Sequence, residues 1–178
     1  MHAALDRNRL AALVVTVIAA ATIAAAWAFE LIGGYVPCAL CLEERIPYYL
    51  GIPVALAALV AAWIGGPAWL PRLLLVLAAL VFAWGAWLGI YHAGAEWGFW
   101  PGPADCAAGA APPTTSAADI LSQMEGMRIV SCTEASWRFP AGWGLSFAGW
   151  NAAISIVLVG VALWGAAPKS YGSSSVSQ

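Results

Sequence analysis

Four long apolar stretches limit what this 178-residue chain can fold into, at residues 10–32, 46–64, 73–91 and 145–166. Each is close to the ~20 residues that a helix rising ~1.5 Å per residue needs to cross ~30 Å of hydrocarbon. Only 9% of the residues are charged, against about 25% in soluble domains. We therefore expect an all-α membrane protein, with residues 1–178 forming one integral membrane domain built on a four-transmembrane-helix bundle.

The distribution of charges and cysteines predicts how the bundle is oriented. Four spans place both termini on one side and two loops, residues 33–45 and 92–144, on the other. The termini side carries four basic residues and the loop side three, which favours cytoplasmic termini. All four cysteines fall in the two outer loops, as expected for an oxidising compartment.

The first outer loop contains a C-x-x-C pair, Cys38 and Cys41. If the preceding Pro37 occupies the first turn of a helix, both cysteines lie on one face of its N-terminus, where free N–H groups favour a thiolate. Arg45 follows on the same stripe, one to two turns deeper. The pattern predicts a redox dithiol at the membrane surface with a cation beneath it.

The second outer loop carries the other two cysteines, Cys106 and Cys132. Between them, residues 116–119 resemble a helix-capping box, and apolar residues then recur at helical spacing. These apolar residues are Ile120, Leu121, Met124 and Met127. We expect a short amphipathic helix lying on the membrane surface.

Other interpretations fit some of these features. A C-x-x-C pair also occurs in structural disulfides and zinc sites, although Cys106 and Cys132 are too far apart to form a second C-x-x-C. Arg45 could simply extend to the lipid headgroups, and His92 could be a passive interfacial residue. The N-terminal basic and apolar segment resembles a cleavable signal peptide, but its apolar run is longer than the usual ~7–15 residues, so we expect it to form the first span.

The combination of these features resembles the bacterial disulfide-bond formation protein B (DsbB) family over the whole chain. The stretch P-C-A-L-C-L-E-E-R at residues 37–45 is similar to that family's P-C-x-L-C-x-x-E-R signature, and residues 91–103 are similar to a segment of some of its branches. The resemblance implies an enzyme of the bacterial inner membrane that reoxidises a periplasmic, DsbA-like thioredoxin-fold protein. It also implies that electrons pass to a quinone, ubiquinone or menaquinone.

The resemblance further implies a role for each cysteine. The partner would attack Cys106 of a Cys106–Cys132 disulfide, and Cys132 would then exchange with Cys38. Cys41 would be freed to face the quinone ring.

The remaining site residues implied by the resemblance surround the quinone. Arg45 would favour the thiolate and stabilise negative charge on a quinone oxygen, with Glu44 and His92 as neighbours. We expect no metal, no nucleic-acid partner and a monomer. Two alternatives stay open: an enzyme like vitamin K epoxide reductase, whose C-x-x-C would lie late in the bundle, and a four-span scaffold held by structural disulfides.

Overall fold

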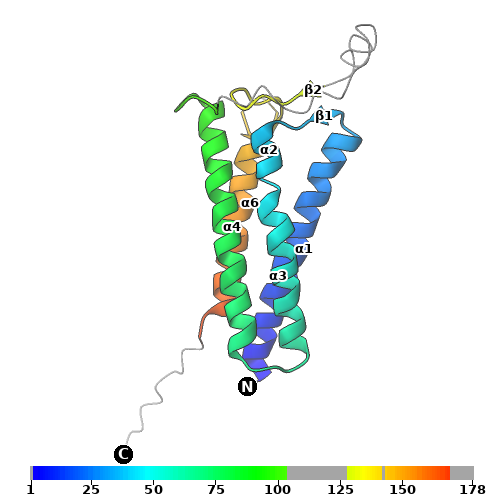
Figure 1. Ribbon diagram of the computed structural model, residues 1–178, viewed down its shortest axis with the longest axis vertical. Helices are drawn as coiled ribbons and strands as arrows, with labels where there is room; N and C mark the ends of the chain where they lie inside the picture. Colours follow the sequence, from blue (N-terminus) through cyan, green and yellow to red (C-terminus); the bar gives the residue numbers. More distant parts are fainter. Residues whose placement is uncertain (1, 104–127, 142, 169–178) are drawn as a thin grey trace, which may run out of the picture.

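The computed structural model describes residues 2–103, 128–141 and 143–168. Within them, four long helices stand side by side (Figure 1) and are long and apolar enough to cross a membrane. They are α1 (His2–Leu31), α3 (Ile46–Trp63), α4 (Trp69–Glu96) and α6 (Phe147–Ala166). The predicted four-helix membrane fold is thereby confirmed. The expected surface helix around Ile120 to Met127, and Cys106, lie outside the described residues.

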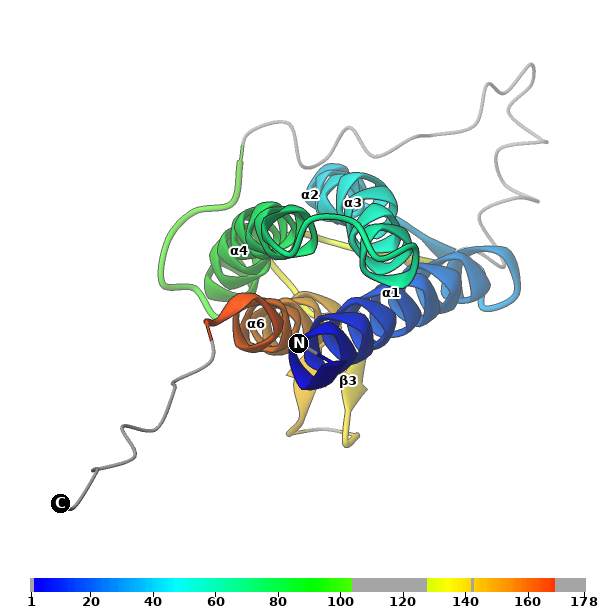
Figure 2. The same ribbon diagram turned by 90° about the horizontal axis from the view of Figure 1, so that it is seen from below.

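The helices enclose a core of mainly small side chains. Viewed end-on (Figure 2), they form a ring in which α3 packs between α1 and α4, and α6 closes the ring against α4 and α1. Phe82, Leu75 and Leu158 are among the larger side chains buried inside. Large apolar side chains such as Leu80 and Trp87 point outward and are exposed. An apolar exterior around helices with internally satisfied backbones suits a bilayer.

The closest approach between α4 and α6 depends on Gly89. A Cβ atom added there would lie 2.8 Å from the backbone nitrogen of Ala152, so the two helices would have to move apart. Small residues at such contacts allow membrane helices to pack closely. We expect Gly89→Ala to destabilise the bundle by about 1–3 kcal/mol, measured by thermal unfolding in detergent. Gly160→Ala is the matched control, because a Cβ at Gly160 meets nothing within 4 Å; equal stability of the two variants would contradict the prediction.

A short helix, α2 (Ala39–Glu43), precedes α3 at the outer end of the bundle. It begins two residues after Pro37, so the proline lies outside the first turn where the sequence had placed it, and Cys38 is the N-cap. Pro47 lies in the first turn of α3 and has no N–H to continue a helix from α2. The break between α2 and α3 therefore falls at Glu44 and Arg45.

Two small strand pairs connect the outer segments. Strand β1 (Tyr35–Val36) pairs in parallel with β2 (Arg128–Ile129), and the Val130 N–H continues this pairing to the Val36 carbonyl at 3.1 Å. Strand β3 (Arg138–Phe139) pairs antiparallel with β4 (Leu145–Ser146), which leads directly into α6. The first pair fixes the end of the second outer loop against the first loop.

Helix α4 continues five residues beyond the expected end of the third span, to Glu96. His92 therefore lies within a helix instead of at the start of a loop. After α4 the chain turns back, and Trp100 stacks on Tyr91 and donates to the Tyr91 carbonyl at 2.9 Å. A side chain at Gly94 would overlap the Trp100 ring. This glycine thus allows Trp100 to cover the outer end of α4.

Candidate active site

Cys38 and Cys41 are free thiols whose sulfur atoms lie 2.7 Å apart. The N-cap position of Cys38 brings its sulfur to the backbone N–H of Cys41, which donates to it at 3.2 Å. The hydrogen bond from the Cys41 side chain lowers the pKa of the Cys38 thiol to about 5, with a further contribution from His92 and against the opposing effect of burial. Cys38 is consequently a thiolate at neutral pH, the form that reacts in disulfide exchange, and a good leaving group from a disulfide.

Cys132 is brought next to this dithiol by the pairing of β1 with β2. It is disulfide-bonded and is packed with Cys38, Leu40 and Val130 in one buried cluster. The sulfurs of Cys38 and Cys132 and a ring nitrogen of His92 all lie within 4.8 Å of one another. The thiolate of Cys38 and the disulfide sulfur of Cys132 thus lie close enough for exchange after a small movement.

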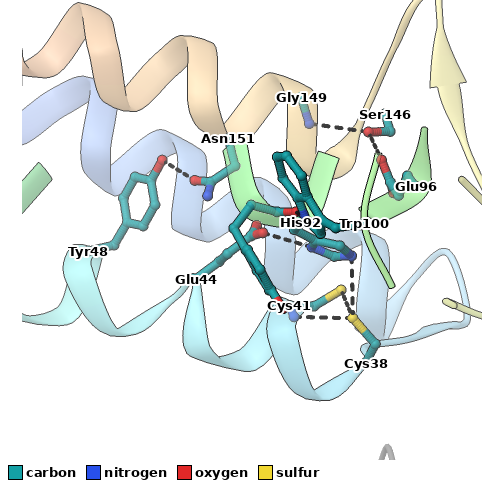
Figure 3. Close-up of polar contacts among 11 residues, drawn as sticks. Cys38, Cys41, Glu44, Tyr48, His92, Glu96, Trp100, Ser146, Gly149 and Asn151 are labelled. Atoms are coloured by element: carbon teal, nitrogen blue, oxygen red, sulfur yellow. Dashed lines mark hydrogen bonds and ion pairs between the residues drawn. The ribbon is translucent and has the colours of Figure 1, made fainter. Parts of the chain in front are cut away.

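A buried histidine–carboxylate pair lies beside Cys38. The Nδ1 atom of His92 is 2.7 Å from Oε1 of Glu44, and its Nε2 is 3.8 Å from the Cys38 sulfur. In Figure 3, dashed lines join Glu44 to His92 and His92 to Cys38. The exposed fraction is 1% for His92 and 7% for Glu44. Because a carboxylate accepts the Nδ1 hydrogen, Nε2 is directed toward the sulfur.

Arg45 occupies a different position from the one that the helical stripe suggested. Its Nη1 atom pairs with Oε2 of Glu30 at 2.6 Å, and its guanidinium lies over the Trp27 ring, 5.1 Å from the centroid. Both partners come from α1. The contacts to the Cys38 sulfur come instead from Cys41 and His92. Arg45 and Cys41 nevertheless line one common cavity.

This cavity, of about 540 Å³, lies between the outer ends of α1, α3 and α6. Most of its wall is apolar, and the aromatic rings of Phe29, Tyr35, Trp137 and Phe147 contact one another along it. Its polar lining is limited to a few groups. They are Thr22, Glu30, Cys41, Glu44, Arg45, Tyr48 and Asn151. A mainly apolar cavity with a few converging polar groups is typical of a small-molecule site.

Three polar residues inside the spans escaped the sequence-based prediction. The Tyr48 hydroxyl donates to Oδ1 of Asn151 at 2.7 Å and lies 3.3 Å from the Ser155 hydroxyl. Within the described residues, the buried Nδ2 atom of Asn151 has no hydrogen-bond partner. Asn151 and Ser155 are one helical turn apart in an otherwise apolar span, a pattern that by itself indicates a functional polar site in a membrane helix.

The same geometry bears on the zinc interpretation. Cys38, His92 and Cys132 could offer three ligand atoms within 4.8 Å. A metal-binding cysteine must be a thiolate, whereas the sulfur of Cys132 is engaged in a disulfide. The site as it stands therefore favours exchange chemistry over metal binding.

The family model described as "Disulfide bond formation protein DsbB" matches residues 8–165. The chain belongs to the DsbB family. An uncharacterised protein of Rickettsia prowazekii (strain Madrid E) is 27% identical over 155 residues, which cover 86% of this chain and 85% of that protein. No solved structure matches the chain.

Membership of the DsbB family assigns this four-helix protein to the membrane proteins of disulfide-bond formation and implies a thiol oxidoreductase role. The predicted family is thereby confirmed. The structure brings together Cys38, Cys41, Cys132, His92 and Glu44, and it places Arg45 on the wall of the adjoining cavity.

Proposed function

We propose that this DsbB-family protein is a thiol:quinone oxidoreductase that reoxidises a periplasmic, DsbA-like thioredoxin-fold protein. The observation that carries the proposal is the different surroundings of the two cysteines of the C-x-x-C pair. Cys38 faces the disulfide-bonded Cys132, whereas Cys41 lines the 540 Å³ cavity. One sulfur can thus exchange with the outer loop while the other meets a small electron acceptor.

The acceptor that suits the cavity is a membrane quinone, ubiquinone or menaquinone. Apolar and aromatic walls accommodate a quinone ring, and Arg45 and the unpaired Nδ2 of Asn151 are the kinds of donor that its carbonyl oxygens require. When bound, the quinone supplies a two-electron oxidant. Such an oxidant is needed because the reduction potential of DsbA-like proteins is about −120 mV. This value is higher than that of ordinary cysteine pairs, which therefore cannot reoxidise them.

The electrons would move through the cysteines in successive exchanges. The reduced partner would attack Cys106 of a Cys106–Cys132 disulfide, and the thiolate of Cys132 would leave. Cys132 would then attack Cys38 of an oxidised Cys38–Cys41 pair and release Cys41 at the cavity. The second thiol of the partner would displace Cys106 and close the partner's disulfide. Cys106 would then attack Cys132 of the transient Cys132–Cys38 bridge, which leaves the C-x-x-C pair as the dithiol that the structure describes.

We also propose that the protein lies in the bacterial inner membrane and crosses it four times. Both termini would be cytoplasmic, and both cysteine pairs would face the periplasm. We further propose that the protein acts as a monomer and binds neither nucleic acid nor metal. The four spans meet around one core, and the site is built from one chain.

The proposal is tested by reconstitution. Purified protein in detergent is given a reduced DsbA-like protein and a soluble ubiquinone or menaquinone analogue, and quinol formation is followed by absorbance alongside partner thiol loss. One quinol should form per partner disulfide. Partner oxidation without quinol formation, or no partner oxidation at all, would contradict the proposal.

The second cysteine pair should be needed only for the partner. We expect the double variant Cys106→Ser, Cys132→Ser to lose at least about 10³-fold in partner oxidation, since the exchange route is removed. Oxidation of the Cys38–Cys41 dithiol by the quinone analogue should persist, because that pair lines the cavity directly. Stopped-flow absorbance measures both rates. Full partner oxidation by the double variant would show that Cys106 and Cys132 are structural.

A further inference from the structure

His92 connects the reacting sulfur with a buried acid. Its two ring nitrogens have different partners, Glu44 at 2.7 Å and the Cys38 sulfur at 3.8 Å. Burial of a carboxylate is costly unless it is paired and hydrogen-bonded, and this one is almost excluded from solvent. An arrangement with this cost calls for a chemical role beyond packing. In the steps described above, His92 only favours the Cys38 thiolate and Glu44 only lines the cavity.

Glu44 also reaches the cavity. It belongs to the cavity wall together with Cys41, whereas Cys38 does not. The line Cys38, His92, Glu44 therefore runs from the sulfur that faces Cys132 to the space where an acceptor would bind (Figure 3). An imidazole can accept a proton on one nitrogen and release one from the other, which lets it pass protons between its two partners.

From this geometry we infer that His92 and Glu44 form a proton relay that takes the proton of the Cys38 thiol and releases it at the cavity wall. The inference rests on the proposed thiol:quinone reaction. When the Cys38–Cys41 disulfide forms, two electrons and two protons must reach the quinone. One proton comes from the S–H bond of Cys41, and the other is the proton that Cys38 gave up on becoming a thiolate. Cys41 lines the cavity and gives up its proton there, but Cys38 is buried away from it.

The relay gives the Cys38 proton a route of its own. The proton that Cys38 gives up is held on the His92 ring, whose Nε2 faces the thiolate. As the disulfide forms, Nδ1 passes its proton to the Glu44 carboxylate, and the resulting carboxyl group releases it into the cavity. His92 contacts a reacting atom, whereas Glu44 acts through His92.

The other titratable groups around the relay are few among the described residues. Cys41 donates to Cys38 from α2, and Cys132 on the loop segment is disulfide-bonded and does not titrate. Glu96, one turn further along α4, accepts a hydrogen bond from the Ser146 hydroxyl, and Tyr48 lines the cavity together with Glu44. The titration of Cys38 must therefore be compared between proteins that all retain Glu96 and Cys41.

The first test needs no quinone. The alkylation rate of Cys38 by iodoacetamide is measured against pH in the reduced protein, with the site resolved by mass spectrometry. In the wild type the midpoint should lie at about 5, the pKa of the Cys38 thiol. Glu44→Gln and His92→Gln should each raise that midpoint by about one unit, because the cationic form of the ring that favours the thiolate is lost. Glu43→Gln, which alters the exposed neighbouring acid, should leave it unchanged.

The second test measures the proton transfer in a single turnover. Oxidation of the Cys38–Cys41 dithiol by a soluble ubiquinone analogue is followed in H₂O and in D₂O. Glu44→Gln should slow it by about 10²-fold, as for loss of a general acid–base group. Glu44→Asp, which retains a carboxyl group, should recover part of both the rate and the wild-type midpoint, as a purely packing role would not.

The outcomes separate the relay from the proposed function. Equal alkylation midpoints and equal single-turnover rates for Glu44→Gln and Glu43→Gln would overturn the relay, even if the wild type reduces quinone. Failure of the wild type to reduce any quinone would instead overturn the proposed function and the relay's delivery to the cavity, whatever the alkylation midpoints of the variants.

Discussion

Replacing Cys41 with serine should make a Cys38–Cys132 disulfide the major form of the isolated protein. The thiolate of Cys38 and the disulfide sulfur of Cys132 already lie within 4.8 Å of each other in a buried cluster. Two groups held this close react as if at a very high concentration. The exchange releases the Cys106 thiolate, and without Cys41 only that thiolate remains to reverse it, so capping Cys106 with an alkylating agent retains the new bond. Acid trapping followed by proteolysis and mass spectrometry without reductant identifies the bridged peptides.

Cys38→Ser is the matched control for this trapping experiment. It leaves Cys41, whose sulfur lines the cavity, and it should yield little Cys41–Cys132 bridge. The serine hydroxyl in Cys41→Ser can still donate to Cys38 and thereby preserve most of the thiolate character that the Cys41 thiol provides. Equal amounts of bridged peptide in the two variants would show that the two cysteines are not differently placed.

Arg45→Ala should lower kcat/KM for a soluble quinone analogue by about 10²-fold, the usual effect of removing one preorganised donor from a site where charge develops. Arg45 is 8% exposed and lines an apolar cavity, where its charge acts at a lower effective dielectric than in water. Exchange of the partner with the Cys106–Cys132 pair should remain within about twofold, because that pair lies in the other outer loop. Steady-state kinetics at varied quinone and varied partner concentrations separates the two steps.

The ion pair between Arg45 and Glu30 requires a control of its own. Removal of the arginine leaves Glu30 unpaired at the cavity, which could itself disturb quinone binding. The double variant Arg45→Ala, Glu30→Gln removes that charge. We expect it to remain as slow as Arg45→Ala, and Arg45→Lys to be intermediate because it keeps the charge without the planar fork. Recovery of the wild-type rate by the double variant would limit Arg45 to neutralising Glu30.

Much of the local structure could be predicted because it depends on residues close together in the sequence. The apolar spans have the length of a bilayer, and the spacing of Cys38 and Cys41 already places both sulfurs on one side of a short helix. The signature at residues 37–45 also identified the family. The start of α2 differed from expectation because Cys38, and not a residue before it, has the extended backbone and side-chain acceptor of an N-cap.

The surroundings of the charged residues could not be predicted in this way. A helical stripe placed Arg45 beneath the cysteines, but the helix breaks at Glu44 and Arg45, and the packing of α1 against α3 brings the guanidinium to Glu30 and Trp27. His92 occupies the position beside the sulfur that the sequence had suggested for the arginine. The packing of separate helices decides which polar residue contacts a given atom. The periodicity of a single helix does not predict such contacts.

The sequence alone determined that this chain is a four-span helical membrane protein with a C-x-x-C pair at one surface, since both follow from apolar length and local spacing. Only the tertiary structure decided that Cys38 faces Cys132 while Cys41 faces a cavity, and that Glu44, at the break between α2 and α3, meets His92 on α4. These contacts join residues about 50 to 100 positions apart. They form because the pairing of β1 with β2 and the packing of the bundle bury the groups together, and no local pattern specifies that.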